Sequence, residues 1–187
     1  MSAIRTFIAL STQPGVQQTV AAVQAMLKET EADVKWDPAD KFHITLKFLG
    51  NVEVSKIDSL STALSHSLSP FSSFEIIYNT VGVFPDLRDP RVIWIGTEAA
   101  AAVIELSSAV EHVCLGLGFP KENRAFHPHI TLGRVKGIHH RDRLTDAIKT
   151  ITFEPIPSRC SDVLLLKSDL KPSGSIYTIL KSFPLQS

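Results

Sequence analysis

The sequence lacks an excess of either charge. Its 187 residues include 19 Lys and Arg and 19 Asp and Glu, which gives a formal net charge of zero. Proteins that grip a long stretch of nucleic-acid backbone carry a basic excess, so we expect any nucleic-acid partner to be contacted locally, for example at one phosphate. Disordered chains combine low hydrophobicity with high net charge. A hydrophobic content of 44% excludes that class.

Cysteine is also scarce. Cys114 and Cys160 form no CxxC pair, which excludes a disulfide framework and fits a reducing compartment. No segment approaches the ~18 consecutive apolar residues of a membrane helix, and the apolar stretch 1–10 is interrupted by Arg5 and Thr6, unlike a signal peptide. We therefore expect a cytoplasmic protein with no membrane partner, long enough to form one domain or two small lobes.

Hydrophobic periodicity predicts strands that alternate with amphipathic helices. The first helix is expected to begin at Pro14, with Ser11 or Thr12 as its cap. The expected strands are 4–10, 42–49, 74–84, 92–95, 129–132, 163–166 and 176–180, and the expected helices are 14–27, 57–68, 98–117 and a segment around 144–148. This order indicates an α/β or α+β sandwich.

One tetrapeptide occurs twice. His-Ile-Thr-Leu at 43–46 returns at 129–132, which is 86 positions later (129 − 43). Both copies lie on expected strands, where alternate residues share a face. His43 and Thr45 therefore lie side by side, about 6–7 Å apart, and so do His129 and Thr131. If two similar lobes pack about a pseudo-two-fold axis, these polar faces meet in one cleft.

Such a cleft suits acid–base chemistry at a phosphate. Imidazole has an unperturbed pKa near ~6.5, so one ring can accept a proton while the other donates one, and each transfer typically contributes ~10²–10⁴-fold in rate. Threonine hydroxyls donate hydrogen bonds to phosphate oxygens. Arg134, five residues after His129, adds a charged fork. These groups fit metal-free cleavage of a phosphodiester.

Simpler interpretations stay open. A single His-x-Thr on a strand is usually a satisfied polar pair, and a duplicated copy can be kept for packing after gene duplication. Zinc is another alternative, because His127 lies beside His129 and the pair at 139–140 follows. The intervening Pro128, the cysteine spacing and the absence of a His-Glu helix pattern argue against it. His66 and His112 lie in helical patterns and are expected at the surface.

At these residues the sequence resembles the 2H phosphoesterase superfamily, which is defined by two His-x-Thr/Ser motifs. It is most similar to the LigT-like branch, the RNA 2′,3′-cyclic phosphodiesterases of the ThpR type, first described as 2′-5′ RNA ligases. Lys41 departs from the pattern, since many relatives carry asparagine there. The resemblance spans nearly the whole chain and is carried by Arg-Thr-Phe-Ile-Ala at 5–9, Phe-His-Ile-Thr-Leu-Lys-Phe-Leu-Gly at 42–50, Arg-Val-Ile-Trp at 91–94, Phe-His-Pro-His-Ile-Thr-Leu-Gly-Arg at 126–134, and Ser-Asp-Leu at 168–170 with Gly174 and Tyr177.

The resemblance implies an α+β fold of two pseudo-symmetric, intertwined lobes forming one domain over 1–187, with antiparallel sheets facing across a cleft and helices outside. It implies hydrolysis of a 2′,3′-cyclic phosphate on RNA ends or nucleotides to a 2′-phosphomonoester, with reversible 2′-5′ ligation as a second reaction. His129 would be the base and His43 the acid, whereas the identical motifs themselves do not distinguish the two roles. Thr45 and Thr131 would hold phosphate oxygens, Arg134 would bind phosphate, and a monomer with no metal or cofactor is expected.

Two alternatives concern the ligand. A non-catalytic module could bind a nucleotide or RNA end in the same cleft, and an enzyme of this kind could act on ADP-ribose 1″,2″-cyclic phosphate or 2′-5′ linked oligonucleotides. Phe48, Trp94 and Phe126 are candidate stacking surfaces, although burial in the core is the commoner role of an aromatic. A basic rim of Lys41, Lys47, Arg134 and Lys136 is expected to guide RNA.

Overall fold

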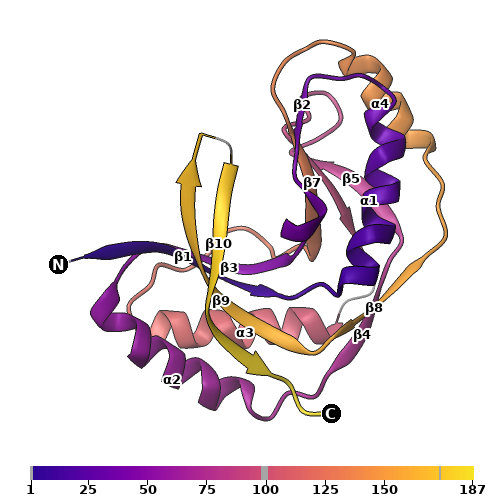
Figure 1. Cartoon of the computed structure of the whole chain (residues 1–187). Coiled ribbons are helices and arrows are strands. Elements are labelled where there is room, and N and C mark those ends of the chain that lie inside the picture. Colours follow the sequence, from indigo (N-terminus) through magenta and orange to yellow (C-terminus); the bar gives the residue numbers. More distant parts are fainter. Residues whose placement is uncertain (1, 98–100, 173) are drawn as a thin grey trace.

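The computed structural model describes residues 2–97, 101–172 and 174–187. Figure 1 shows the order of the elements along the chain. The strands are β1 (Ala3–Leu10), β2 (Val34–Trp36), β3 (Ile44–Glu53), β4 (Phe74–Tyr78), β5 (Thr80–Phe84), β6 (Val92–Gly96), β7 (His129–Val135), β8 (Ile156–Cys160), β9 (Asp162–Lys171) and β10 (Gly174–Pro184). The helices are α1 (Pro14–Lys28), α2 (Ile57–Leu68), α3 (Ala101–Gly116) and α4 (Arg141–Thr150), with 3₁₀ turns at Ala39–Lys41 and Val54–Lys56.

The strands form two lobes that meet at a narrow junction. The antiparallel order is β10-β9-β1-β3-β7-β6-β5, with β2 beside β7, and β4 and β8 form a separate pair. Between the lobes, β3 and β7 share a single ladder pair, Ile44 with Ile130. Figure 1 shows α2 and α3 together beside β1 and β3, and α1 and α4 together beside β7 and β5. The predicted α+β fold with two lobes is therefore confirmed, with the strands of both lobes continuous through this junction.

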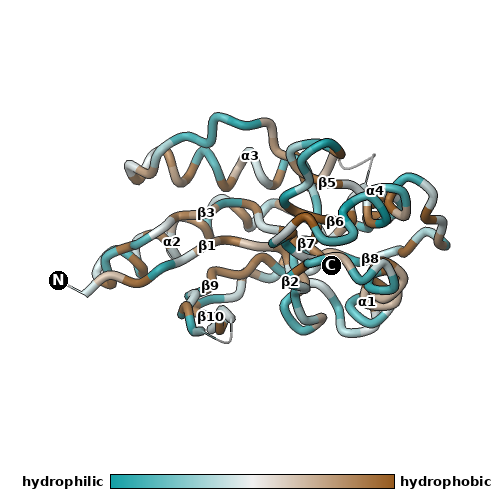
Figure 2. The backbone as a smooth tube through the Cα atoms, turned by 90° about the horizontal axis from the view of Figure 1, so that it is seen from above, coloured by the Kyte–Doolittle hydropathy of each residue, from teal (hydrophilic) through white to brown (hydrophobic). Residues whose placement is uncertain are grey.

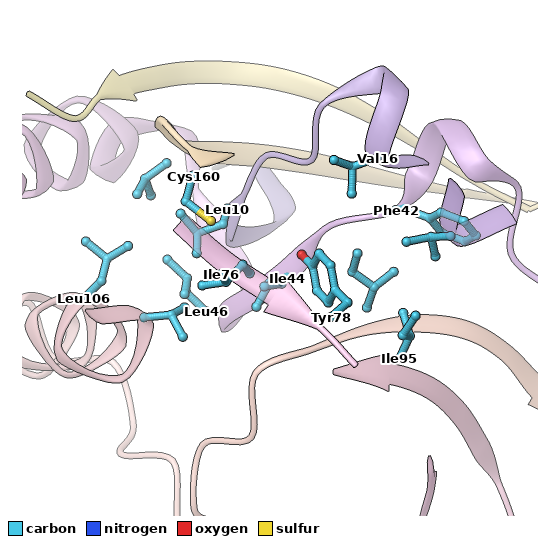
Figure 3. Close-up of a cluster of buried hydrophobic side chains, with 14 of the residues drawn as sticks. Leu10, Val16, Phe42, Ile44, Leu46, Ile76, Tyr78, Ile95, Leu106 and Cys160 are labelled. Atoms are coloured by element: carbon cyan, nitrogen blue, oxygen red, sulfur yellow. The ribbon is translucent and has the colours of Figure 1, made fainter. Parts of the chain in front are cut away.

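Alternation along β1 separates the two sides of the sheet. Ile8 and Leu10 face the helices and belong to the main core, whereas Phe7 and Ala9 pack with Leu166 in a second, smaller cluster on the other side. Figure 2 shows apolar stretches in the central strands and a helix, α3, running along one side of them. Figure 3 shows core side chains contributed by both lobes in one buried cluster. The helices thus cover one face and leave the other free for a site.

Several expected elements differ in their ends or in their continuity. The expected strand 74–84 is interrupted at Asn79, and its halves β4 and β5 join different sheets. The strand from Ile44 continues through Gly50 to Glu53, because β1 keeps pairing with it. Helix α1 starts at Pro14, but Gln13 is its N-cap and no side chain caps it. Positions 98–100 of the third expected helix and 173 of the expected turn lie outside the described residues. No helix among the described residues is long and apolar enough to cross a membrane.

Candidate active site

Both copies of the repeated tetrapeptide contain a β-bulge at their leucine. Strand β1 pairs with Thr45 and next with Lys47, which leaves Leu46 outside the ladder. Strand β6 likewise pairs with the residues on either side of Leu132 and not with Leu132 itself. A bulge adds one residue to one strand, so the residues that follow it change faces.

The bulges decide which side chains enter the site. Strict alternation from His129 would direct Arg134 toward the helices, together with Leu132. Because of the bulge, Arg134 instead lines the same cavity as His129. Its counterpart in the first motif, 86 positions earlier (134 − 86), is Phe48, which also lines the cavity and is 62% exposed. Strict alternation would place Phe48 on the core face with Ile44, and the bulge at Leu46 is the reason that it lies in the cavity instead.

The two motifs share one cleft of about 1220 Å³. All the residues singled out in the sequence for catalysis or phosphate binding line it, namely His43, Thr45, His129, Thr131 and Arg134. Its lining comes from strands of both lobes and, on one side, from helix α3, which contributes residues from Ser107 to Leu115. Two imidazoles, two hydroxyls and one guanidinium therefore converge on a single solvent-filled space.

Backbone carbonyls fix the orientation of both imidazoles in the same way. His43 Nδ1 lies 2.6 Å from the carbonyl oxygen of Lys41, and His129 Nδ1 lies 2.6 Å from that of His127. A carbonyl only accepts hydrogen bonds, so Nδ1 carries the proton in both rings and Nε2 is the nitrogen left for chemistry. Because the partner is a backbone atom, lysine in place of asparagine at position 41 leaves this contact unchanged.

The threonines differ in their contacts. The Thr45 hydroxyl lies 3.0 Å from Nε2 of His43 and donates to it while the ring is neutral. Thr131 lines the cleft two residues beyond His129, and no hydrogen bond joins those two side chains in the described part of the chain. The first motif is therefore internally hydrogen-bonded, whereas the second leaves Nε2 of His129 facing the cleft.

Aromatic rings support each histidine. The His43 ring packs 5.1 Å from Phe7 and 5.5 Å from Tyr177, edge-on to the latter. The His129 ring packs edge-on to Phe84 at 5.0 Å and lies 6.3 Å from Trp94. Sequence reasoning missed Phe84, and it named Phe7 and Tyr177 only as parts of the resemblance. The local pattern around them carries no signal, because these contacts join distant strands.

Burial lowers the pKa of both histidines below the usual 6.5, chiefly because the charged ring loses water. At His43 the carbonyl of Lys41 and the carboxylate of Asp37 oppose this shift, and the charges of His129 and Arg134 add to it. At His129 the positive charge of Arg134 also lowers the pKa. Both rings are therefore mainly neutral at pH 7 in the free protein, and a bound anion would favour protonation.

Arg134 is held in place by an acidic partner that the sequence did not suggest. Its Nη1 donates to Asp37 Oδ2 at 2.9 Å. Asp37 is in turn positioned by the buried Gln24, whose side-chain amide donates to the carbonyls of Asp37 and Leu132 at 2.7 and 2.8 Å. Arg134 keeps about half of its side chain exposed to the cleft. One carboxylate therefore orients the guanidinium and leaves part of it available to an anion.

The expected basic rim is only partly present. Lys41 and Lys136 line the cleft. Lys47 also lines this cavity, but it is 6% exposed and its ammonium donates to Glu111 of α3 at 2.6 Å, so its charge is already paired. The bulge at Leu46 explains this, because it turns Lys47 toward the helices.

The remaining histidines and aromatics are distributed differently. Phe126 is half-buried and lines the cleft, whereas Trp94 is 8% exposed and packs edge-on to His127 at 4.6 Å. His66 and His112 are exposed, as predicted. His139 and His140 stack on each other at 3.8 Å beside the start of α4. Among the described residues, no three His, Cys, Asp or Glu side chains gather as metal ligands, so the zinc alternative finds no ligand set there.

A comparison with protein families matches almost the whole chain. The family described as LigT like Phosphoesterase matches residues 10–94 and again 95–177, so each match contains one copy of the histidine motif. The chain belongs to this LigT-like phosphoesterase family. The recognition of the 2H phosphoesterase superfamily from the two motifs is thereby confirmed.

Relatives of this LigT-like chain align over nearly their full length. An RNA 2′,3′-cyclic phosphodiesterase of Methanothermobacter thermautotrophicus is 35% identical, and the alignment covers 97% of this chain and 99% of that protein. An RNA 2′,3′-cyclic phosphodiesterase of Thermotoga maritima is 31% identical, and the alignment covers 95% of this chain and 93% of that protein. Among solved structures, E. coli LigT complexed with 3′-AMP has a TM-score of 0.78 at 25% identity and full coverage of both chains. Apo E. coli LigT, at 23% identity, has a TM-score of 0.80 over the full length of both chains and shows the same fold.

Proposed function

We propose that this protein hydrolyses a 2′,3′-cyclic phosphate on an RNA end or a nucleotide to a 2′-phosphomonoester, without a metal ion. The observation that carries the proposal is the matched pair of imidazoles. Each presents Nε2 to one cleft while a backbone carbonyl holds its Nδ1 proton. The relatives named RNA 2′,3′-cyclic phosphodiesterase support the substrate class. The 3′-AMP complex of E. coli LigT supports a nucleotide ligand.

In this mechanism His129 removes a proton from water through Nε2, and the resulting oxygen attacks phosphorus. His43 gives its Nε2 proton to the departing 3′-oxygen. Each transfer is expected to contribute roughly 10²–10⁴-fold. Thr45 and Thr131 donate to the nonbridging oxygens, and Arg134 stabilises the negative charge that grows on them. The assignment of base and acid follows the family resemblance.

The lowered pKa values fit this division of labour. A base must be neutral before attack, and burial keeps the imidazole of His129 neutral. An acid must be protonated, and burial alone disfavours that form of His43. The negative charge of a bound phosphodiester opposes the burial effect and favours the imidazolium. Substrate binding therefore supplies the charge that His43 needs.

The test is hydrolysis of nucleoside 2′,3′-cyclic phosphates in the presence of EDTA, with the product isomer identified by chromatography. We expect a 2′-phosphomonoester, full activity in EDTA, and a large loss in His43→Ala and His129→Ala. His66→Ala, which changes an exposed histidine on α2, is the matched control and should keep full activity. Unchanged turnover in both motif variants would refute the proposal. Tight nucleotide binding with no turnover would identify a binding module instead.

A further inference from the structure

Lys41 differs from the other lysines and arginines that line the cleft. Four of them are paired with carboxylates, namely Lys47, Arg91, Arg124 and Arg134. Three more are exposed to water, namely Arg5, Lys35 and Lys136. Lys41 is half-buried, and its ammonium forms no ion pair or hydrogen bond with the residues that the structure describes. Burying a charge without a partner costs free energy, so an anion beside this ammonium would be stabilised.

The backbone fixes the place from which the Lys41 side chain leaves. Its N–H donates to the carbonyl of Pro38 at 3.0 Å, and its carbonyl accepts the Nδ1 proton of His43. Its Nζ reaches the start of β10, where it lies 3.7 Å from the point that a Cβ on Gly174 would occupy. Gly174 and Tyr177 of this strand line the same cleft. The ammonium therefore lies on the side of the first lobe, to which His43 also belongs.

The second motif has a different side chain at the equivalent position. The residue 86 positions after Lys41 is His127 (41 + 86). Its carbonyl holds the ring of His129 in the same way, but its own ring packs edge-on against Trp94 at 4.6 Å and Phe84 at 5.5 Å. At this position a permanent positive charge is therefore present in the first lobe alone.

We propose that Lys41 binds a second phosphate of the substrate, the one attached to the 5′-oxygen of the terminal ribose. This inference rests on the proposed function, in which the cyclic phosphate lies between the two imidazoles.

The direction of the reaction places the ribose near Lys41. His43 gives its proton to the 3′-oxygen, and this oxygen stays on the ribose, so the ribose lies toward the first lobe. Its 5′-oxygen is then on the side of Lys41, and the phosphate on that oxygen is the next anionic group of the substrate. An ammonium donates charge-assisted hydrogen bonds to phosphate oxygens. The preferred substrate is therefore a terminal nucleotide that is phosphorylated on its 5′ side, either within an RNA chain or as a free nucleotide.

The test compares Lys41→Met with the unchanged protein on three substrates. They are adenosine 2′,3′-cyclic phosphate, the same compound with a 5′-phosphate, and a dinucleotide that ends in a 2′,3′-cyclic phosphate. A hydrogen bond to a charged group corresponds to roughly tenfold or more in binding. We therefore expect kcat/KM to fall about tenfold on the two substrates with a phosphate on the 5′ side, mainly through KM, and less than about twofold on the first substrate.

Two further variants control for the charge. Lys41→Arg retains a cation and should keep most of the activity on all three substrates. Lys181→Met removes an exposed charge of β10 outside the cleft lining, and it should leave the relative activities on the three substrates unchanged.

Two results would overturn the inference: an equal loss on all three substrates, or no loss on either substrate with a phosphate on the 5′ side. A loss that includes the dinucleotide identifies the phosphodiester of an RNA chain as the ligand of Lys41. A loss confined to the 5′-phosphorylated mononucleotide identifies a free nucleotide instead.

Equilibrium binding asks the same question without turnover. Adenosine 2′,5′-bisphosphate should bind about tenfold more tightly than adenosine 2′-phosphate, and Lys41→Met should remove that difference. A difference that Lys41→Met leaves unchanged would overturn the role of Lys41. If the protein hydrolyses none of the substrates, the proposed function fails, and the binding comparison still decides whether Lys41 binds the 5′-phosphate.

Discussion

The largely buried ion pair between Lys47 and Glu111 is expected to contribute strongly to the free energy of unfolding. Lys47 donates to Glu111 Oε2 at 2.6 Å and to the carbonyl of Pro120 at 3.0 Å, and its side chain is 5% exposed. The second carboxylate oxygen of Glu111 accepts the backbone N–H of Glu122 at 3.0 Å. The pair therefore ties β3 and α3 to the segment that leads into the second histidine motif.

Replacing Lys47 with Met keeps an unbranched chain of similar length and removes the charge. Glu111 is then left without its cation, and the carbonyl of Pro120 loses a donor. Breaking a buried pair by removing one partner costs about 3–5 kcal/mol. Because Glu111 is 22% exposed and keeps some water, we take the lower end, about 3 kcal/mol, which corresponds to roughly 6–12 °C in Tm for a chain of this size.

Urea unfolding measures this change as a lower midpoint at an unchanged slope. The double variant Lys47→Met/Glu111→Gln removes the orphaned charge and keeps an oxygen for the N–H of Glu122. It should be more stable than Lys47→Met alone by about 1–2 kcal/mol, because an uncompensated buried charge is the main penalty. A loss under about 1 kcal/mol in the single variant, or a double variant less stable than the single one, would refute this account of the pair.

Four further predictions follow from the site and its supports. Burial lowers the pKa of both His43 and His129. A plot of kcat/KM against pH should therefore be bell-shaped, with its maximum on the acidic side of pH 6.5. A maximum well above neutral pH would contradict this. Asp37→Asn removes a charge that raises the pKa of His43, so the alkaline limb of that profile should move to lower pH; an unmoved limb would argue against His43 as the acid. Gly82→Ala places a methyl group 2.3 Å from the indole of Trp94 and should lower the free energy of unfolding, measured in urea, by about 1–3 kcal/mol. An unchanged free energy of unfolding would show that the indole can shift without cost. The pKa of His43 in the folded state lies below its value in the unfolded state, so the contribution of His43 to stability is full above pH 6.5 and is lost as the pH falls. The variant His43→Gln should therefore lose less stability on acidification than the unchanged protein does, as urea unfolding at several pH values would show.

Residues that alternate cleanly were predictable from the sequence. Ile44, Ile130 and Leu132 lie in the core as the period of two requires, and the repeated tetrapeptide placed His43 and His129 in one cleft. The reason is that a strand period fixes side-chain faces locally, and the same local sequence produced the same local geometry twice. The two Nδ1 contacts to the carbonyl two residues earlier are part of that repetition.

Features that depend on pairing between distant strands were not predictable. A bulge at Leu46 arises from the register with β1, and one-residue register changes leave no mark in the hydrophobic pattern. That change placed Lys47 in the interior and Phe48 in the cleft. Strand β2 has three residues, and β8 contains Pro157 and lacks a long apolar run, so neither carries a strand signal. Asp37, which immediately follows β2, was missed for the same reason.

The short strand β2 also explains why the two motifs differ beyond their bulges. Gly133 occupies the position equivalent to Lys47, and a Cβ there would lie 2.8 Å from Val34 and 2.9 Å from Trp36. Glycine at 133 therefore permits the close approach of β2, whereas Lys47 at the equivalent position of the first lobe reaches Glu111 of α3 and the carbonyl of Pro120. The approach of β2 in turn brings Asp37 beside Arg134. The three-residue strand β2 lies beside the second motif, where it positions Asp37 to orient Arg134. In the first motif the position equivalent to Arg134 is the exposed ring of Phe48.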